Sequence, residues 1–156
     1  EGVSETVPMK PDVVLVPLDG SEISESVVPL ASVIAAKMGA ELLFVRVSNM
    51  AYSSAMGDAG IYYASPVTFD QASSEAAEYL EPFVEAAKLA DISASMQTPT
   101  GSPANALMAI ADENENTLIV IGTRGQSGLK RLVLGSVTDK VIRTSGHPVL
   151  VVPPNG

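Results

Sequence analysis

The chain has 156 residues, no cysteine, a single histidine and a formal net charge of −9 at pH 7. Its length suits one domain with its own core, and the missing residue types exclude disulfides, thiolate chemistry and multi-histidine metal sites and make a Ser-His-Asp triad improbable. The acidic excess argues against nucleic acid and anionic membranes as partners, and no apolar run approaches the roughly 20 residues of a membrane span.

Short β-branched apolar runs alternate along the chain with segments of helical apolar spacing. Such runs suit strands buried on both faces of a parallel sheet, whose crossovers carry helices. In chain order the predicted elements are a strand at 13–18, a helix at 21–39, a strand at 41–47, a helix at 67–91, a weak strand at 92–99, a helix at 102–116, a strand at 117–122, a helix at 136–146 and a strand at 147–153. The alternation predicts an α/β fold with helices on both faces of a parallel sheet.

The first predicted helix carries an apolar stripe that we expect to face the sheet. The stripe consists of Ile23, Val27, Leu30, Ile34 and Met38. Pro29 should kink this helix or mark a later effective start, and Gly39 suits its end. In the helix at 102–116, Ser102 as N-cap and Pro103 at the first helical position form a start signal.

Two segments have no regular pattern. Residues 1–10 resemble a loose, flexible tail and lack the charged-then-apolar pattern of a signal sequence, so we expect a single domain over 11–156, in the cytoplasm. Residues 48–66 contain Tyr52, Tyr62 and Tyr63, which fit a lid, a dimer contact or a disordered loop.

Positive charge is concentrated near the end of this acidic chain. Five of the nine lysines and arginines lie between residues 122 and 148, where Asp139 is the one acid. A local positive field of this kind favours a small anion as partner, because a polyanion would meet the acidic remainder.

A glycine-rich segment, GTRGQSGLKRLVLGS at 122–136, begins this basic region. Gly122 and Gly125 allow positive φ and close approach to a ligand, and Gly135 removes a side chain where a phosphate would press on the backbone. The first amides of the following helix have no partner within it and lie at the positive end of its dipole, where Ser136 adds a hydroxyl. Ligands of such sheets bind beyond the carboxyl ends of the strands, so Asp19, after the first strand, is expected to face the same crevice.

Each feature also has a plain structural interpretation. Glycine-rich turns are common after strands, Ser136 could be a simple N-cap, and Asp19 could cap the helix at 21–38. As a ligand contact, Asp19 would meet ribose hydroxyls first and the water shell of Mg²⁺ second, because a carboxylate repels a triphosphate. The segment is neither a Walker A motif nor the dinucleotide fingerprint. His147, with no acid or nucleophile nearby, is expected to be structural or to face solvent.

Three segments together resemble the universal stress proteins, in their ATP-binding branch. They are VLVPLDGSEISESVVPLASVIA near the start, GTRGQSGLKRLVLGSVTDKVI with its G-2x-G-9x-G-(S/T) spacing, and the closing HPVLVVP. The resemblance covers residues 10 to 153. It implies an adenine nucleotide alpha hydrolase-like fold with five parallel strands in the order 3-2-1-4-5, a homodimer, and ATP bound where the strand order reverses, with Mg²⁺ carried by the phosphates.

The resemblance also assigns residues to the nucleotide by position. Pro17, Leu18 and Asp19 would line the nucleoside side, and the backbone of Val47 would contact adenine. The residues carried over to the ribose and phosphates are Gly122, Thr123, Arg124, Gly125, Gly128, Gly135, Ser136, Val137 and Thr138.

Three functions remain open from the sequence. The first is a nucleotide-dependent regulatory protein of the stress response. The second is a slow ATPase or phosphotransferase, for which no convincing base is visible. The third is a nucleotide-free dimeric scaffold, because the apolar strand at 147–153 lies at the expected sheet edge and could pair with its twin across a two-fold axis.

Overall fold

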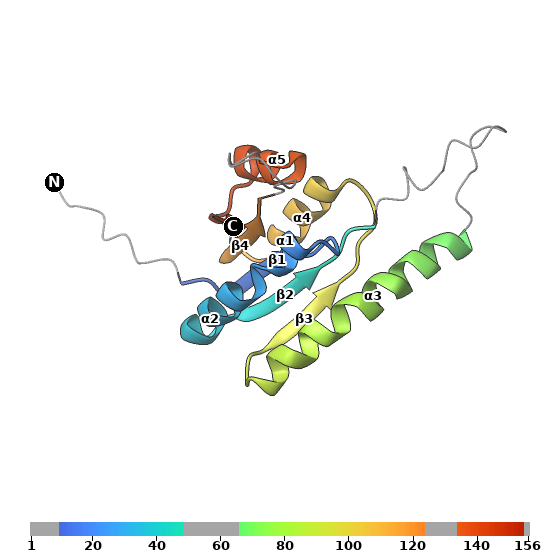
Figure 1. Ribbon diagram of the computed structural model, residues 1–156. Helices are drawn as coiled ribbons and strands as arrows, with labels where there is room; N and C mark the ends of the chain where they lie inside the picture. Colours follow the sequence, from blue (N-terminus) through green and yellow to red (C-terminus); the bar gives the residue numbers. More distant parts are fainter. Residues whose placement is uncertain (1–9, 49–65, 124–133, 155–156) are drawn as a thin grey trace.

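The computed structural model describes residues 10–48, 66–123 and 134–154 (Figure 1). Its elements in chain order are β1 Val13–Pro17, α1 Glu22–Glu25, α2 Val28–Met38, β2 Glu41–Val45, α3 Pro66–Leu89, β3 Ala94–Gln97, α4 Pro103–Ala111, β4 Thr117–Gly122, α5 Ser136–Thr144 and β5 Val149–Val152. The starts of β1, β2, α4 and α5 and both ends of β4 agree with the sequence prediction. The end of α4 comes five residues earlier than predicted, the helix predicted over 21–39 is divided, and the remaining ends differ by one or two residues.

The five strands form one parallel sheet in the order β3-β2-β1-β4-β5. This confirms the predicted fold class and strand order. The first strand lies in the middle of the sheet, paired with β2 on one side and β4 on the other. The connection after β1 leads to β2 and the connection after β4 leads to β5 on the opposite side, so a crevice is expected between the carboxyl ends of β1 and β4.

Two apolar layers cover the two faces of the sheet (Figure 1). On one face, α2 and α3 pack on alternate strand residues that include Val14, Phe44 and Val120. On the other face, α4 and α5 pack on Leu15, Ile119 and their neighbours. The strands are apolar on both sides because both sides are covered.

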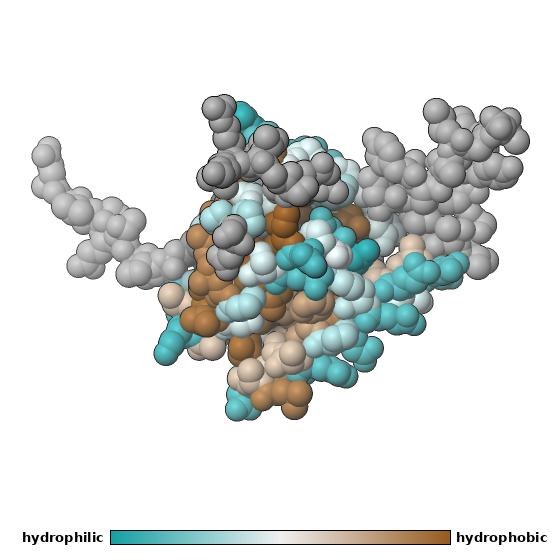
Figure 2. All heavy atoms as spheres, viewed as in Figure 1, coloured by the Kyte–Doolittle hydropathy of each residue, from teal (hydrophilic) through white to brown (hydrophobic). Residues whose placement is uncertain are grey.

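The helix predicted over 21–39 is two helices, and its predicted stripe is wrong in part. Pro29 occupies the second position of α2, which confirms the later start, and Gly39 ends α2 with φ of 65°. The buried line runs through Val27, Ala31 and Ala35, whereas Leu30 and Met38 are each 42% exposed. Alanine lets α2 lie close to the sheet, and the break after α1 resets the direction in which each side chain points. Figure 2 shows apolar atoms at the surface around α2, and hydrophilic ones along the outer side of α3.

An aromatic series fixes α3 to the sheet. The Tyr79 and Phe83 rings have centroids 5.6 Å apart, and Phe83 lies 5.9 Å from the fully buried Phe44 of β2. Tilted ring pairs at these distances stabilise beyond their buried area. Within the described ranges, no helix combines the length and apolar character that a membrane crossing requires. Tyr52, Tyr62 and Tyr63 lie outside the described residues.

Candidate functional site

A crevice of about 180 Å³ opens at the carboxyl ends of β1, β2 and β4. The starts of α1, α4 and α5 complete its walls. The lining residues are Pro17, Leu18, Asp19, Ser21, Ser24, Val45, Val47, Pro103, Leu107, Ile121, Gly122, Gly135, Val137 and Thr138. Its middle is apolar, and its hydroxyl and carboxylate groups come from the β1–α1 turn and from Thr138. This combination of apolar walls and a few polar groups is typical of small-molecule sites.

The β1–α1 turn is held by a closed set of short polar contacts. Oδ1 of Asp19 accepts hydrogen bonds from the backbone N–H of Ser21 at 2.9 Å and from its hydroxyl at 2.5 Å. The hydroxyl of Ser24 accepts from the Asp19 N–H at 3.2 Å and donates to the Ser21 carbonyl at 2.9 Å. Between them Gly20 has φ of 88°, which a side chain would oppose. The N-cap of α1 is Ser21, so the alternative of Asp19 as the cap is wrong.

The opposite wall is the beginning of α5. Its N-cap is Gly135, not Ser136, and no side chain caps it. The first α-helical hydrogen bond runs from the Asp139 N–H to the Gly135 carbonyl at 2.9 Å. The amides of residues 136–138 therefore have no partner within the helix, and they lie at the positive end of its dipole. The start of α5, a nine-residue helix, therefore suits an anion.

Gly122 has a packing role that the sequence did not predict. Its φ is not in the positive range, contrary to the expectation from its position in a glycine-rich segment. A Cβ at Gly122 would lie 3.0 Å from the Ile23 carbonyl oxygen and 3.4 Å from Cγ1 of Val27. The missing side chain allows α1 to lie against the end of β4. The Gly122 carbonyl also accepts a 3.0 Å hydrogen bond from the Thr138 hydroxyl, which joins β4 to α5.

The predicted site residues are distributed unevenly around the crevice. Those that line it are Pro17, Leu18, Asp19, Val47, Gly122, Gly135, Val137 and Thr138. Ser136 is exposed at the start of α5, and Thr123 is buried at 1% exposure with no hydrogen-bond partner for Oγ1 among the described residues. The remaining three predicted residues, Arg124, Gly125 and Gly128, lie outside the described residues.

Six lining residues were missed by the sequence patterns. They are Ser21, Ser24, Val45, Pro103, Leu107 and Ile121. Val45 and Ile121 lie at the carboxyl ends of β2 and β4, Ser21 and Ser24 lie at the start of α1, and Pro103 and Leu107 belong to α4. The rule that places ligands at the carboxyl ends of strands could have pointed to this edge of the sheet.

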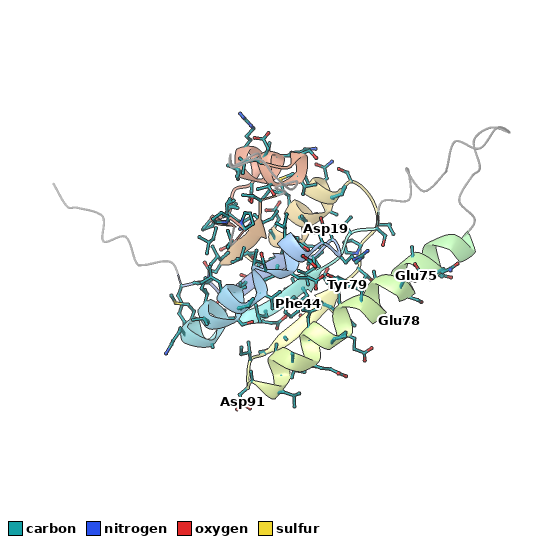
Figure 3. All side chains as sticks on the ribbon, in the orientation of Figure 1. Asp19, Phe44, Glu75, Glu78, Tyr79 and Asp91 are labelled. Carbon is teal, nitrogen blue, oxygen red and sulfur yellow. The ribbon has the colours of Figure 1, made fainter. Side chains whose placement is uncertain are left out.

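A cation and an aromatic ring lie behind the β1–α1 turn. The Arg46 guanidinium, one residue after β2, lies over the Tyr79 ring with Cζ 4.5 Å from the centroid. The Tyr79 hydroxyl donates a 3.0 Å hydrogen bond to Oε2 of Glu25, the last residue of α1. Burial, followed by the hydrogen bond to Glu25 and its charge, raises the pKa of Tyr79 to about 12. Figure 3 shows Tyr79 on the side of α3 that faces the sheet.

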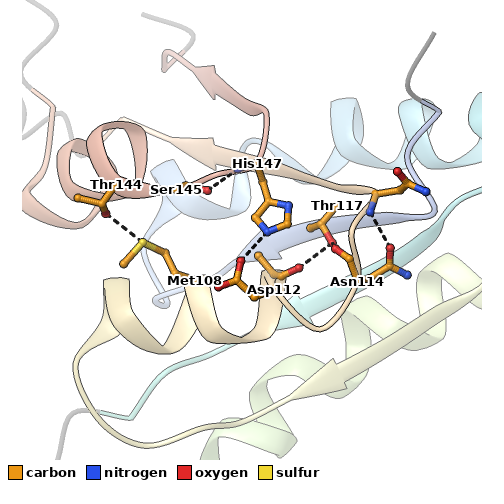
Figure 4. Close-up of polar contacts among 9 residues, drawn as sticks. Met108, Asp112, Asn114, Thr117, Thr144, Ser145 and His147 are labelled. Atoms are coloured by element: carbon orange, nitrogen blue, oxygen red, sulfur yellow. Dashed lines mark hydrogen bonds and ion pairs between the residues drawn. The ribbon is translucent and has the colours of Figure 1, made fainter. Parts of the chain in front are cut away.

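His147 has an acidic partner, contrary to the sequence expectation (Figure 4). Nε2 of His147 lies 2.7 Å from Oδ1 of Asp112, and the imidazole side chain is 10% exposed. This pair joins the start of β5 to the end of α4. Since the amino ends of parallel strands lie at the edge opposite the crevice, His147 is structural and does not reach the site.

A magnesium ion has few protein ligands to choose from in this crevice. Of the described residues on its lining, Asp19 alone has a carboxylate, and one of its oxygens already accepts two hydrogen bonds. Across the described ranges, no cluster of three or more acidic or histidine side chains could hold a metal ion. The donor set therefore fits Mg²⁺ held by phosphate oxygens and water with at most one carboxylate.

Comparison with known proteins gives one consistent result. The sequence profile of the Universal stress protein family matches residues 11–153. Universal stress protein YxiE of Bacillus subtilis is 34% identical over 142 residues, which are 88% of this chain and 96% of YxiE. The solved structure of hypothetical protein MJ0577 has a TM-score of 0.78 at 23% identity, covering 95% of this chain and 99% of its own. A universal stress protein in complex with cAMP has a TM-score of 0.64 at 26% identity, covering 92% and 98%.

Proposed function

The chain belongs to the universal stress protein family, and we propose that its crevice binds an adenine nucleotide, with ATP as the preferred ligand. The proposal depends above all on the two walls of the crevice. Asp19 and its serine neighbours provide carboxylate and hydroxyl groups on one side, and the amides of 136–138, which have no partner within α5, begin this helix on the other. The complex of a related protein with cAMP supports the same ligand class.

The parts of a nucleotide match the parts of the crevice. The apolar middle, with Val45, Val47 and Ile121, suits the adenine ring, and the backbone of Val47 can contact its edge. Asp19 accepts from the ribose hydroxyls. The phosphates lie at Gly135 and the first turn of α5, where the helix dipole favours negative charge. The family resemblance also assigns Gly122, Thr123, Arg124, Gly125 and Gly128 to this end, and Mg²⁺ arrives with the phosphates.

The activity we propose is regulatory: nucleotide occupancy changes the conformation or assembly of the protein in a stress response. Hydrolysis is slow or absent in this proposal, because phosphoryl transfer needs a positioned water and charge stabilisation beyond what binds the phosphates. A slow ATPase or phosphotransferase is the alternative. It predicts phosphate release from added ATP, whereas the regulatory proposal predicts bound ATP that remains intact.

Isothermal titration with ATP, ADP, AMP and cAMP, in the presence of Mg²⁺, tests the site directly. Gly135 has φ of −63° and ψ of 159°, which valine adopts without strain, so Gly135→Val should fold normally and block the phosphates. Gly146→Val is the matched control, because a Cβ at Gly146 meets nothing within 4 Å. We expect binding to be lost in the first variant and kept in the second. Wild-type affinity in a folded Gly135→Val protein would refute the phosphate assignment.

We also propose that the protein is a homodimer through the edge strand at 147–153. All four residues of β5 are half-buried in the single chain, and β5 has a neighbour on one side, β4. An apolar edge strand of this kind favours pairing with an identical strand across a two-fold axis. Sedimentation equilibrium should give twice the chain mass, and a monomer at micromolar concentration would contradict the proposal.

A further inference from the structure

The Arg46 side chain packs against the β1–α1 turn as well as against Tyr79. A Cβ added to Gly20 would lie 2.9 Å from Nη1 of Arg46 and 3.6 Å from Nη2. The guanidinium therefore occupies the space that a side chain at this turn would take. The φ of 88° at Gly20 opposes a side chain, and a Cβ there would also displace the Arg46 guanidinium.

The Tyr79 ring holds the Arg46 guanidinium in a fixed position. A guanidinium is planar and stacks on an aromatic face, which an ammonium does less well. The ring itself is fixed by Phe83 and by the hydrogen bond to Glu25. The resulting cluster of Arg46, Tyr79 and Glu25 contacts the β1–α1 connection at Gly20 and at the end of α1.

The charges in this cluster are complementary. The carboxylates of Asp19 and Glu25 both act on the Tyr79 phenol in one direction, and Arg46 acts on it in the other. The guanidinium and both carboxylates are therefore within electrostatic reach of the same phenol.

From this arrangement we propose that Arg46 is a positioning residue: held between the Tyr79 ring and the Gly20 backbone, it fixes the β1–α1 turn so that Asp19 meets the ribose hydroxyls of the bound nucleotide. The inference rests on the proposed function. It assigns Arg46 no contact with the ligand. Its role is to make the crevice discriminate ribose from deoxyribose. A site built to hydrogen-bond a sugar hydroxyl binds the deoxy sugar less well, because its buried polar groups then have no partner.

The test compares affinities for ATP, 2′-deoxy-ATP, 3′-deoxy-ATP and adenosine, measured by titration or by competition. Wild type should bind ATP better than both deoxynucleotides. Arg46→Met should lower the affinity for ATP by about tenfold and bind the three triphosphates equally. The affinity for adenosine should fall by the same factor as that for ATP, because both carry the ribose. Arg143→Met removes the same charge from an exposed ion pair with Asp139 and should leave all four affinities unchanged.

Two variants at the ring separate positioning from general damage. Tyr79→Phe keeps the ring beneath the guanidinium and should keep the preference for ribose, whereas Tyr79→Leu removes the ring face and should lose it. Unfolding without ligand checks each fold, and Arg46→Lys replaces Arg46→Met if the latter is unfolded, with the ribose preference reduced. The inference is overturned if Arg46→Met keeps the preference, or if ATP loses far more affinity than adenosine, which would mean direct phosphate contact. If wild type binds no nucleotide at all, the failure belongs to the proposed function.

Discussion

Substituting Gly122 by alanine tests the packing at the end of β4. The new Cβ would lie 3.0 Å from the Ile23 carbonyl oxygen and 3.4 Å from both Cγ2 of Ile23 and Cγ1 of Val27. These atoms cannot all move away, because Val27 is fully buried and Gly122 is paired in register with Val152 of β5. Overpacking of this kind costs about 1–3 kcal/mol, and the reduced freedom of the unfolded chain returns about 0.4–1 kcal/mol. The middles of these two ranges leave a net loss of about 1.3 kcal/mol, or a Tm lower by roughly 3–5 °C for a chain of this size.

Thermal and urea unfolding of Gly122→Ala measure this loss, with Gly146→Ala as control. Gly146 is in the same part of the chain and has nothing within 4 Å of an added Cβ, so its variant should stay within about 0.5 kcal/mol of wild type. Nucleotide affinity should fall in Gly122→Ala as well, because the relief of the contact moves α1, which forms a wall of the crevice. A Gly122→Ala protein as stable as wild type would show that the contact with Ile23 and Val27 does not require glycine.

Three further predictions follow from single contacts. The pKa of Tyr79 is raised to about 12 from 10.0, so the phenol should stabilise the fold fully below pH 10 and lose that contribution as the pH rises through about 12. The Tyr79→Phe variant should lack this loss of stability at alkaline pH. Absorbance at 295 nm should show one of the four tyrosines titrating late. Thr138→Val removes the hydrogen bond to Gly122 and should cost about 0.5–1.5 kcal/mol in urea unfolding, with weaker nucleotide binding because α5 is less firmly placed. Thr117→Val removes a buried hydroxyl that lies 3.1 Å from the carbonyl of Ala111 and 2.8 Å from that of Asn114, and should cost about 1–3 kcal/mol. Calorimetry should find nucleotide affinity unchanged, since Thr117 starts β4 at the edge away from the crevice.

Local patterns predicted the elements of this fold better than the faces they present. Both ends of β4 follow from a continuous apolar run bounded by polar residues and glycine, and the start of α4 follows from Ser102 and Pro103. The face of α2 could not be read in the same way. The helical period and hydrophobicity favour Leu30 over Ala31 as the buried residue. The close approach of α2 to the sheet selects the smaller residue for burial instead. Tertiary packing decides which side chain is buried in such cases, and the helical period does not predict that packing.

The site divides in the same manner. The side proposed for the phosphates was predicted from glycines close together in sequence and from the start of a helix, which are local features. The support on the other side of the site is not local, because Tyr79 and Glu25 are 54 residues apart. The His147–Asp112 pair, away from the site, likewise joins residues 35 apart. No spacing rule joins residues at such distances, because the topology of the sheet brings them together. Gly122 shows a third case, in which the motif residue was found but its physical reason, close packing against α1, was not.

The two walls of the crevice differ in how firmly they are held, and this bears on how nucleotide occupancy could act. The β1–α1 turn is fixed by the contacts of Asp19, Ser21 and Ser24 and by the cluster behind it, so it is preorganised for its ligand groups. Among the described residues, one hydroxyl hydrogen bond joins the start of α5 to β4, and no side chain caps this helix. A ligand shifts a conformational equilibrium through the contacts that differ between the two states. In the proposed complex the phosphates meet the start of α5, so they are the part of the nucleotide best placed to change the protein. The helix α5 leads directly into β5 at the edge proposed for dimerisation.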